Sequence, residues 1–201
     1  MSDLHYVFGY ASLVALEDVE ALSGRLNGFR RCWGAAMNNW EGGEGAKHYL
    51  DRASGERPRI RVAYLDLCEK AGLFVNGLAL PVDADRLAAL DEREINYERV
   101  DVSAAFQPAD GDRVADTAPT PLPPASPGRV FTYVGTEAAR ERCRRGLAAG
   151  DCFVSRDYVS GVQRAFAALG EEASAEFDHT TDPLPFPERN LTLILDGRAV
   201  D

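Results

Sequence analysis

Two short stretches of the sequence carry residue types that could bind a small anion and move a proton on it. In residues 90–97, Leu-Asp-Glu-Arg-Glu-Ile-Asn-Tyr, Glu94 has apolar neighbours and is a candidate general acid or base. In residues 10–13, Tyr-Ala-Ser-Leu, an apolar strand runs into a turn of small residues. Successive backbone N–H groups in such a turn form a donor surface suited to a carboxylate or an oxyanion. Together the two stretches predict an enzyme that moves protons within a small, anionic, amino-acid-like substrate.

A helix predicted over residues 83–97 positions the glutamate. Asp83 can cap the first turn of this helix. Leu87, Leu90 and Glu94 recur at helical spacing, so we expect the carboxylate to lie with the leucines rather than in bulk water. Burial of this kind would raise the pKa of Glu94 and suit it to accept and return a proton near neutral pH.

The rest of the pattern mixes short strands with helices and predicts an α+β fold around a small, largely antiparallel sheet or barrel. One domain is expected over residues 1–201, with its core in about residues 5–170. The sequence predicts strands over 6–10, 25–33 (with a kink or bulge at Asn27-Gly28), 60–67, 73–80, 99–102 and 129–134, and helices over 17–22 and 155–169. It predicts a long, mobile loop that covers a site over 38–59, an exposed connection over 108–128 and a proline-rich tail over 177–201 that runs along the surface.

Composition excludes several classes of protein. The net charge of -10 and the lack of a basic stripe disfavour nucleic acid as a partner. No apolar run approaches the roughly 20 residues that span a membrane, and residues 1–10 do not resemble a signal peptide. The four cysteines, Cys32, Cys68, Cys143 and Cys152, include no C-x-x-C pair, so we expect isolated thiols. We therefore expect a cytoplasmic protein with no membrane or nucleic-acid partner.

The two stretches resemble the paired signatures of the γ-glutamylcyclotransferase-like superfamily. Residues 10–13 resemble its Y-G-S-x turn, and residues 90–94 with Tyr97 resemble a second signature whose last glutamate, here Glu94, is catalytic. Segments 26–31 and 74–79 resemble the strands between the signatures, and segment 129–134 resembles the strand that carries a late tyrosine, here Tyr133. The resemblance implies the fold of that superfamily, a small mixed, mostly antiparallel β-barrel with flanking helices.

The resemblance also implies a reaction, the release of 5-oxoproline from a γ-glutamyl compound. The substrate's own α-amine attacks its γ-carbonyl and frees an amine or amino acid, so no cofactor is implied. Holding amine and carbonyl in near-attack geometry can supply roughly 7–11 kcal/mol, and a single carboxylate, Glu94, would serve as the general acid/base. The implied substrate-binding residues are Tyr10, Ala11, Ser12 and Leu13, which would bind the α-carboxylate end, with Tyr97 and Tyr133 lining the pocket.

Two departures from the signatures bear on function. Ala11 replaces the usual glycine, and Ile95 and Asn96 replace glycines of some branches, which leaves the leaving amine open among glutathione, γ-glutamyl amino acids and other γ-glutamyl metabolites. The same pocket could instead serve a γ-glutamyl hydrolase or amine transferase. It could also belong to a non-catalytic γ-glutamyl-binding domain.

Other chemistry finds weaker support in the sequence. A Ser12 nucleophile lacks a partnered histidine, a Cys32–His48 dyad is a weaker guess, and the dispersed histidines disfavour a metal site. Asp91, Glu92 and Glu98 are expected to be solvated charges.

Overall fold

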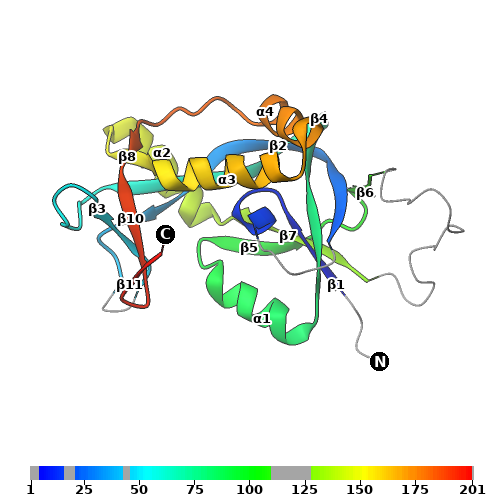
Figure 1. The fold of residues 1–201 in the computed structure, drawn as a ribbon, viewed down its shortest axis with the longest axis horizontal. Coiled ribbons are helices and arrows are strands. Elements are labelled where there is room, and N and C mark those ends of the chain that lie inside the picture. The colour runs from blue at the N-terminus through cyan, green and yellow to red at the C-terminus, as the bar shows by residue number, and fades with distance from the viewer. Residues whose placement is uncertain (1–4, 16–20, 43–45, 110–127, 201) are drawn as a thin grey trace, which may run out of the picture.

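The computed structural model describes residues 5–15, 21–42, 46–109 and 128–200. In this part of the chain a curled, mixed, mostly antiparallel sheet forms a half-barrel, with helices packed around it (Figure 1). The sheet runs in the order β5-β7-β1-β4-β2-β6, and β8 and β9 extend it from β4. The predicted α+β class is therefore confirmed. The strands are β1 (His5–Gly9), β2 (Leu22–Asn38), β4 (Arg61–Val82), β5 (Tyr97–Asp101), β6 (Phe106–Pro108), β7 (Val130–Gly135), β8 (Cys152–Ser155) and β9 (Glu188–Arg189).

The two longest strands of this sheet, β2 and β4, pair with each other in antiparallel orientation. The register of this pair shifts between Asn27 and Phe29, where Gly28 has a φ of 83°, so the predicted bulge at Asn27-Gly28 is confirmed. The separate strands expected over 60–67 and 73–80 belong to one strand, β4, which is interrupted in its pairing with β2 opposite Gly28, where Gly72 has a φ of 80°.

A second, three-stranded sheet corrects two expectations. It pairs β3 (His48–Asp51) with β10 (Leu191–Leu195), which in turn pairs with β11 (Arg198–Val200). Segment 38–59 is therefore not simply a loop, and the tail from 177 does not merely run along the surface. Leu191 is fully buried in a core cluster with Tyr49 and Val62, so the tail contributes to the interior.

Four α-helices and a short 3₁₀ helix lie in the described residues. They are η1 (Ser12–Ala15), α1 (Ala84–Arg93), α2 (Glu137–Ala149), α3 (Arg156–Ala168) and α4 (Glu171–Thr180). The predicted helix over 155–169 is confirmed as α3, which buries Val162 and Phe166. Helices α2 and α4 were not predicted. None of these helices is long and apolar enough to cross a bilayer.

The helix that precedes Glu94 is shorter than expected. Asp83 caps α1 by accepting from the Arg86 N–H at 2.8 Å, as predicted. The helix ends at Arg93, and Glu94 is its C-cap with φ -90° and ψ 45°. Tyr97, expected within the helix, begins β5, which pairs with β7.

Two predicted segments fall mostly outside the described residues. Residues 17–20 of the expected helix over 17–22 lie outside the described residues, and Leu22 already belongs to β2. Residues 110–127 of the expected connection over 108–128 also lie outside them, and its first residue, Pro108, ends β6.

Two of the four cysteines are paired. Cys32 on β2 and Cys68 on β4 form a disulfide with a Cα–Cα distance of 6.1 Å. The expectation of isolated thiols is wrong for this pair, because neither spacing nor flanking residues signal that β2 and β4 are neighbours. The disulfide also excludes a Cys32–His48 thiol dyad, because the Cys32 sulfur is bonded to Cys68. Disulfides persist mainly in oxidising compartments. The cytoplasmic location stays a prediction, and the Cys32–Cys68 disulfide argues against it.

Candidate active site

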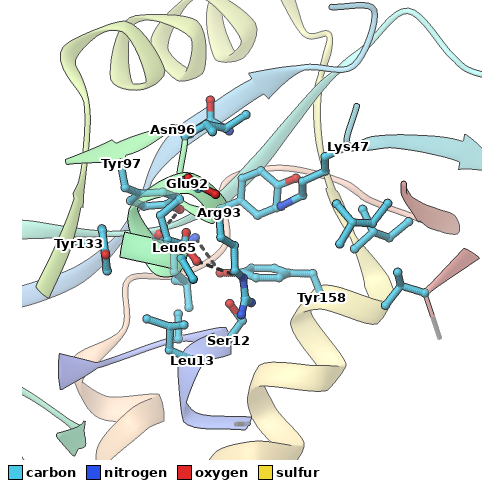
Figure 2. A pocket seen from close by; sticks show the side chains of 18 of the residues that line it. Ser12, Leu13, Lys47, Leu65, Glu92, Arg93, Asn96, Tyr97, Tyr133 and Tyr158 are labelled. Atoms are coloured by element: carbon cyan, nitrogen blue, oxygen red, sulfur yellow. Dashed lines mark hydrogen bonds and ion pairs between the residues drawn. The ribbon is translucent and has the colours of Figure 1, made fainter. Parts of the chain in front are cut away.

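A cavity of about 730 Å³ lies between the end of α1, the turn after β1 and the small sheet. Figure 2 shows Leu13, Tyr97 and Tyr133 together on one side of it, with Lys47 on the other. The structure brings every residue that the sequence predicted for the site to this cavity: Tyr10, Ala11, Ser12, Leu13, Glu94, Tyr97 and Tyr133. Their chemical roles stay predictions.

The turn after β1 is tight because two glycines allow close backbone approach. A Cβ on Gly9 would lie 2.8 Å from the Cβ of Leu13, and one on Gly77 would lie 2.2 Å from the Gly9 carbonyl oxygen. Ala11 has ordinary backbone geometry, since Asp196 is the one non-glycine residue in the described chain with a positive φ. Alanine in place of the signature glycine therefore imposes no backbone strain here.

Glu94 is a largely buried carboxyl group at the cavity wall. Its side chain is 16% exposed, and its Oε1 lies 3.4 Å from Nε of Arg93. Burial raises the pKa of Glu94 above its ordinary value, while the positive charges of Arg93 and Lys47 oppose that rise. The direction agrees with the one expected from the sequence. The nearby Arg99 on β5 binds Asp91 at 2.8 Å.

Lys47 is a cavity residue that the sequence did not reveal. It lies just before β3, and its Nζ is 4.6 Å from the centre of the Tyr64 ring. Burial lowers the pKa of Lys47, and the carboxylate of Glu94 opposes that effect. One carboxyl group and one amine of opposite charge thus line the same cavity.

The tyrosine hydroxyl groups at the site are held by protein acceptors. Tyr10 donates to the Tyr133 carbonyl at 2.9 Å, and Tyr97 donates to the Leu65 carbonyl at 2.8 Å. Burial raises the pKa of both well above that of a free phenol, so both are neutral at physiological pH. These bonds fix the rings as a rigid wall.

Asp91 is an exposed charge, as the sequence predicts, with its side chain 42% exposed. It also accepts from the Tyr133 hydroxyl at 2.8 Å and binds Arg99. Asp91 thus fixes the orientation of one of the predicted pocket tyrosines. The sequence does not indicate this contact, because Tyr133 lies 42 residues from Asp91 along the chain.

Further unpredicted residues at the cavity come from β3, β4, α3 and the tail. One signal for the tail was present in the sequence: Leu-Thr-Leu-Ile-Leu followed by Asp196-Gly197 is typical of a strand entering a hairpin. The cavity residues missed by the sequence reasoning include Tyr49, Tyr64, Tyr158, Leu193, Leu195, Asp196 and Val200.

Arg31 supports the turn from the interior. Its side chain is fully buried, and its Nε donates to the Tyr10 carbonyl at 2.7 Å. Its other donors bind Thr180 Oγ1 at 2.7 Å and Asn76 Oδ1 at 2.8 Å. One guanidinium thus joins the turn to β4 and α4.

Within the described residues, no group of three or more histidine, cysteine, aspartate or glutamate side chains could hold a metal ion. The Nδ1 of His48 lies 2.8 Å from the Ala46 carbonyl oxygen, a local contact within one segment.

Comparison with known proteins gives structural likeness without sequence likeness. Neither a protein-family model nor a curated protein matches the sequence. An uncharacterized protein from Homo sapiens aligns with a TM-score of 0.50 and 12% identity, over 94% of this chain and 94% of that chain. A structure named gamma-glutamyl cyclotransferase aligns with a TM-score of 0.49 and 12% identity, over 93% of each chain. A solution structure of a protein from Arabidopsis thaliana aligns with a TM-score of 0.39 and 24% identity, over 68% of this chain and 72% of that chain.

The likeness to the human protein covers nearly the whole of both chains, and at 12% identity it is a likeness of fold. This chain therefore shares the fold of the human protein, and the predicted α+β class with a mixed, mostly antiparallel sheet and flanking helices is confirmed.

Proposed function

We propose that this protein releases 5-oxoproline from a γ-glutamyl amide, with Glu94 as general acid/base. The observation that carries the proposal is the position of Glu94. Its carboxyl group, with a pKa raised by burial, lines the same cavity as the turn of residues 10–13. A group that accepts a proton and returns it works best when its pKa lies near the operating pH.

The proposed reaction forms one C–N bond and breaks another. The substrate's α-ammonium gives a proton to the Glu94 carboxylate, and the freed amine attacks the γ-carbonyl carbon. The tetrahedral intermediate then expels the second nitrogen as Glu94 returns the proton to it. The ring nitrogen loses its remaining extra proton, which the released amine takes up as an ammonium ion. The products are 5-oxoproline and a free amine, so every atom comes from the substrate and no co-reactant is needed.

The turn after β1 suits the other end of the substrate. The first N–H groups of a short helix such as η1 have no partner within that helix. They can therefore donate to the substrate α-carboxylate or to the developing oxyanion. Ala11 has ordinary backbone geometry, so the turn forms with alanine at this position.

The test is a 5-oxoproline release assay on the purified protein with a panel of γ-glutamyl amides. We expect 5-oxoproline and free amine in equal amounts. Release of glutamate would instead identify a hydrolase, and formation of a new γ-glutamyl amide would identify an amine transferase. Tight binding with no product would identify a binding domain.

The pH dependence of the reaction should respond to Lys47. Because its positive charge lowers the pKa of Glu94, Lys47→Gln should raise that pKa. A larger fraction of Glu94 is then protonated at a given acidic pH and cannot accept the substrate proton. We expect the acidic limb of the kcat/KM profile to move to higher pH, measured by 5-oxoproline release across pH 4–9.

The control for this experiment is Lys70→Gln, which removes the same charge from an exposed position on β4. It should leave the acidic limb in place. A limb that moves to lower pH in Lys47→Gln, or moves equally in both variants, would contradict the coupling between Lys47 and Glu94.

A further inference from the structure

Large apolar side chains are exposed at the mouth of the cavity that holds Glu94. Ile95, Leu195 and Val200 are 71%, 44% and 45% exposed. All three line the cavity together with the partly buried Leu193. We call these four side chains the apolar rim. Exposed apolar side chains gathered on one concave surface indicate a binding site for an apolar group.

The apolar rim is built from two segments that are far apart in sequence. Ile95 follows Glu94 directly, and the other three side chains belong to β10 and β11. Figure 1 shows β10 and β11 at the left of the view, apart from β1 and β7, which carry the turn and Tyr133. The apolar rim and the turn of residues 10–13 thus come from different parts of the fold and line the same cavity as Glu94.

The cavity is larger than a γ-glutamyl group requires. Its volume of about 730 Å³ falls among sites that hold drug-sized molecules, roughly 300–1,000 Å³. Tyr49 and Tyr64 continue the apolar wall inward from the rim. Their hydroxyl groups lie 3.1 Å apart and bind each other, so they need no polar partner from a ligand. The space beyond the γ-glutamyl group is thus large and mainly apolar.

The charges of the cavity disfavour an anion at the rim. The two cationic residues that line the cavity, Lys47 and Arg93, both act on the Glu94 carboxylate. Asp196 lies in the turn between β10 and β11 and also lines the cavity. Its carboxylate would repel a carboxylate on the leaving group.

Resting on the proposed function, we propose that the apolar rim binds the leaving group, and that the preferred substrates are γ-glutamyl amides of apolar or aromatic amines without a carboxylate. The γ-glutamyl group would occupy the turn side of the cavity, with its amide bond at Glu94. Because Ile95 is adjacent to Glu94 in the chain, the first atoms of the leaving amine would reach the rim directly.

The test compares kcat/KM for 5-oxoproline release from γ-glutamylbenzylamide, γ-glutamylphenylalanine, γ-glutamylglycine and glutathione. We expect the benzylamide to exceed γ-glutamylglycine by about tenfold or more, as apolar contacts of this size discriminate in other pockets. Leu195→Ser should remove most of that preference, because it lowers kcat/KM for the benzylamide far more than kcat/KM for γ-glutamylglycine. The matched control is Leu147→Ser, which changes an exposed leucine on α2, outside the cavity. Leu195 is 44% exposed and Leu147 is 54% exposed, so both positions tolerate a polar side chain.

The outcomes separate this inference from the proposed function. Preference for glutathione or γ-glutamylglycine, or a Leu195→Ser effect equal for all substrates, overturns the role of the rim. Equal rates for γ-glutamylphenylalanine and the benzylamide overturn the exclusion of a carboxylate. If no substrate yields 5-oxoproline, the proposed function fails, and calorimetric binding of γ-glutamylbenzylamide then decides on the rim. Binding about tenfold weaker in Leu195→Ser supports the rim, and equal binding overturns it.

Discussion

Glu94→Gln is expected to fold as the parent protein does and to lose turnover by a factor of about 10²–10⁴, the usual contribution of a general acid/base. Glutamine keeps the shape of the side chain but cannot accept the proton of the substrate ammonium. Because burial raises the pKa of Glu94, its ionised form costs the folded state free energy above that pKa. The free energy of unfolding of Glu94→Gln at neutral pH should therefore equal or exceed that of the parent.

The measurement is kcat from 5-oxoproline release, with urea unfolding of the same samples. The matched control is Glu98→Gln, which removes a carboxylate four positions later, at an exposed site on β5 outside the cavity. It should keep the parent rate. Substantial turnover in Glu94→Gln would reject the proposed mechanism, whereas equal losses in both variants would indicate a general effect of charge.

The parts of the site that could be predicted lie in single segments with a local pattern. The spacing of Asp83, Leu87 and Leu90 predicts a capped helix. Glu94 follows that helix and is largely buried because Leu87 and Leu90 are buried. The actual C-cap position of Glu94 differs from the predicted helical one. Its burial nevertheless follows from the same leucine face, since the C-cap residue directly continues that last turn.

The far side of the cavity could not be predicted, because pairing between distant segments creates it. Lys47 reaches the site because β3 pairs with β10, more than 140 residues later, for example Tyr49 with Leu193. Polar glycine-rich sequence before β3 and prolines before β10 suggest irregular structure when each segment is considered alone. The same limit hid the Cys32–Cys68 disulfide, whose geometry depends on the register of β2 against β4.

Arg31→Met should lower the free energy of unfolding by roughly 3 kcal/mol or more, because it leaves buried acceptors without a donor at about 1–3 kcal/mol each. Burial lowers the pKa of Arg31, yet a guanidinium stays protonated at neutral pH. Its hydrogen-bond acceptors are neutral: the Tyr10 carbonyl, Thr180 Oγ1 and two oxygens of Asn76. Relief of the buried charge offsets part of the loss, but the unpaired carbonyl groups of Tyr10 and Asn76 remain in the core.

The matched control is the neighbouring Arg30→Met. Arg30 forms a partly exposed ion pair with Asp182, and such pairs contribute about 0–1 kcal/mol. In urea unfolding, the loss in the free energy of unfolding should therefore be greater for Arg31→Met than for Arg30→Met by about 2 kcal/mol or more. Arg31→Lys should recover little, since one ammonium group cannot span acceptors on the turn, β4 and α4. Equal losses at the two positions, or full recovery by lysine, would mean that Arg31 does not hold the turn of residues 10–13 in place. In that case the turn would be held by the close backbone approach at Gly9 and Gly77 and by the hydrogen bond from Tyr10 to the Tyr133 carbonyl.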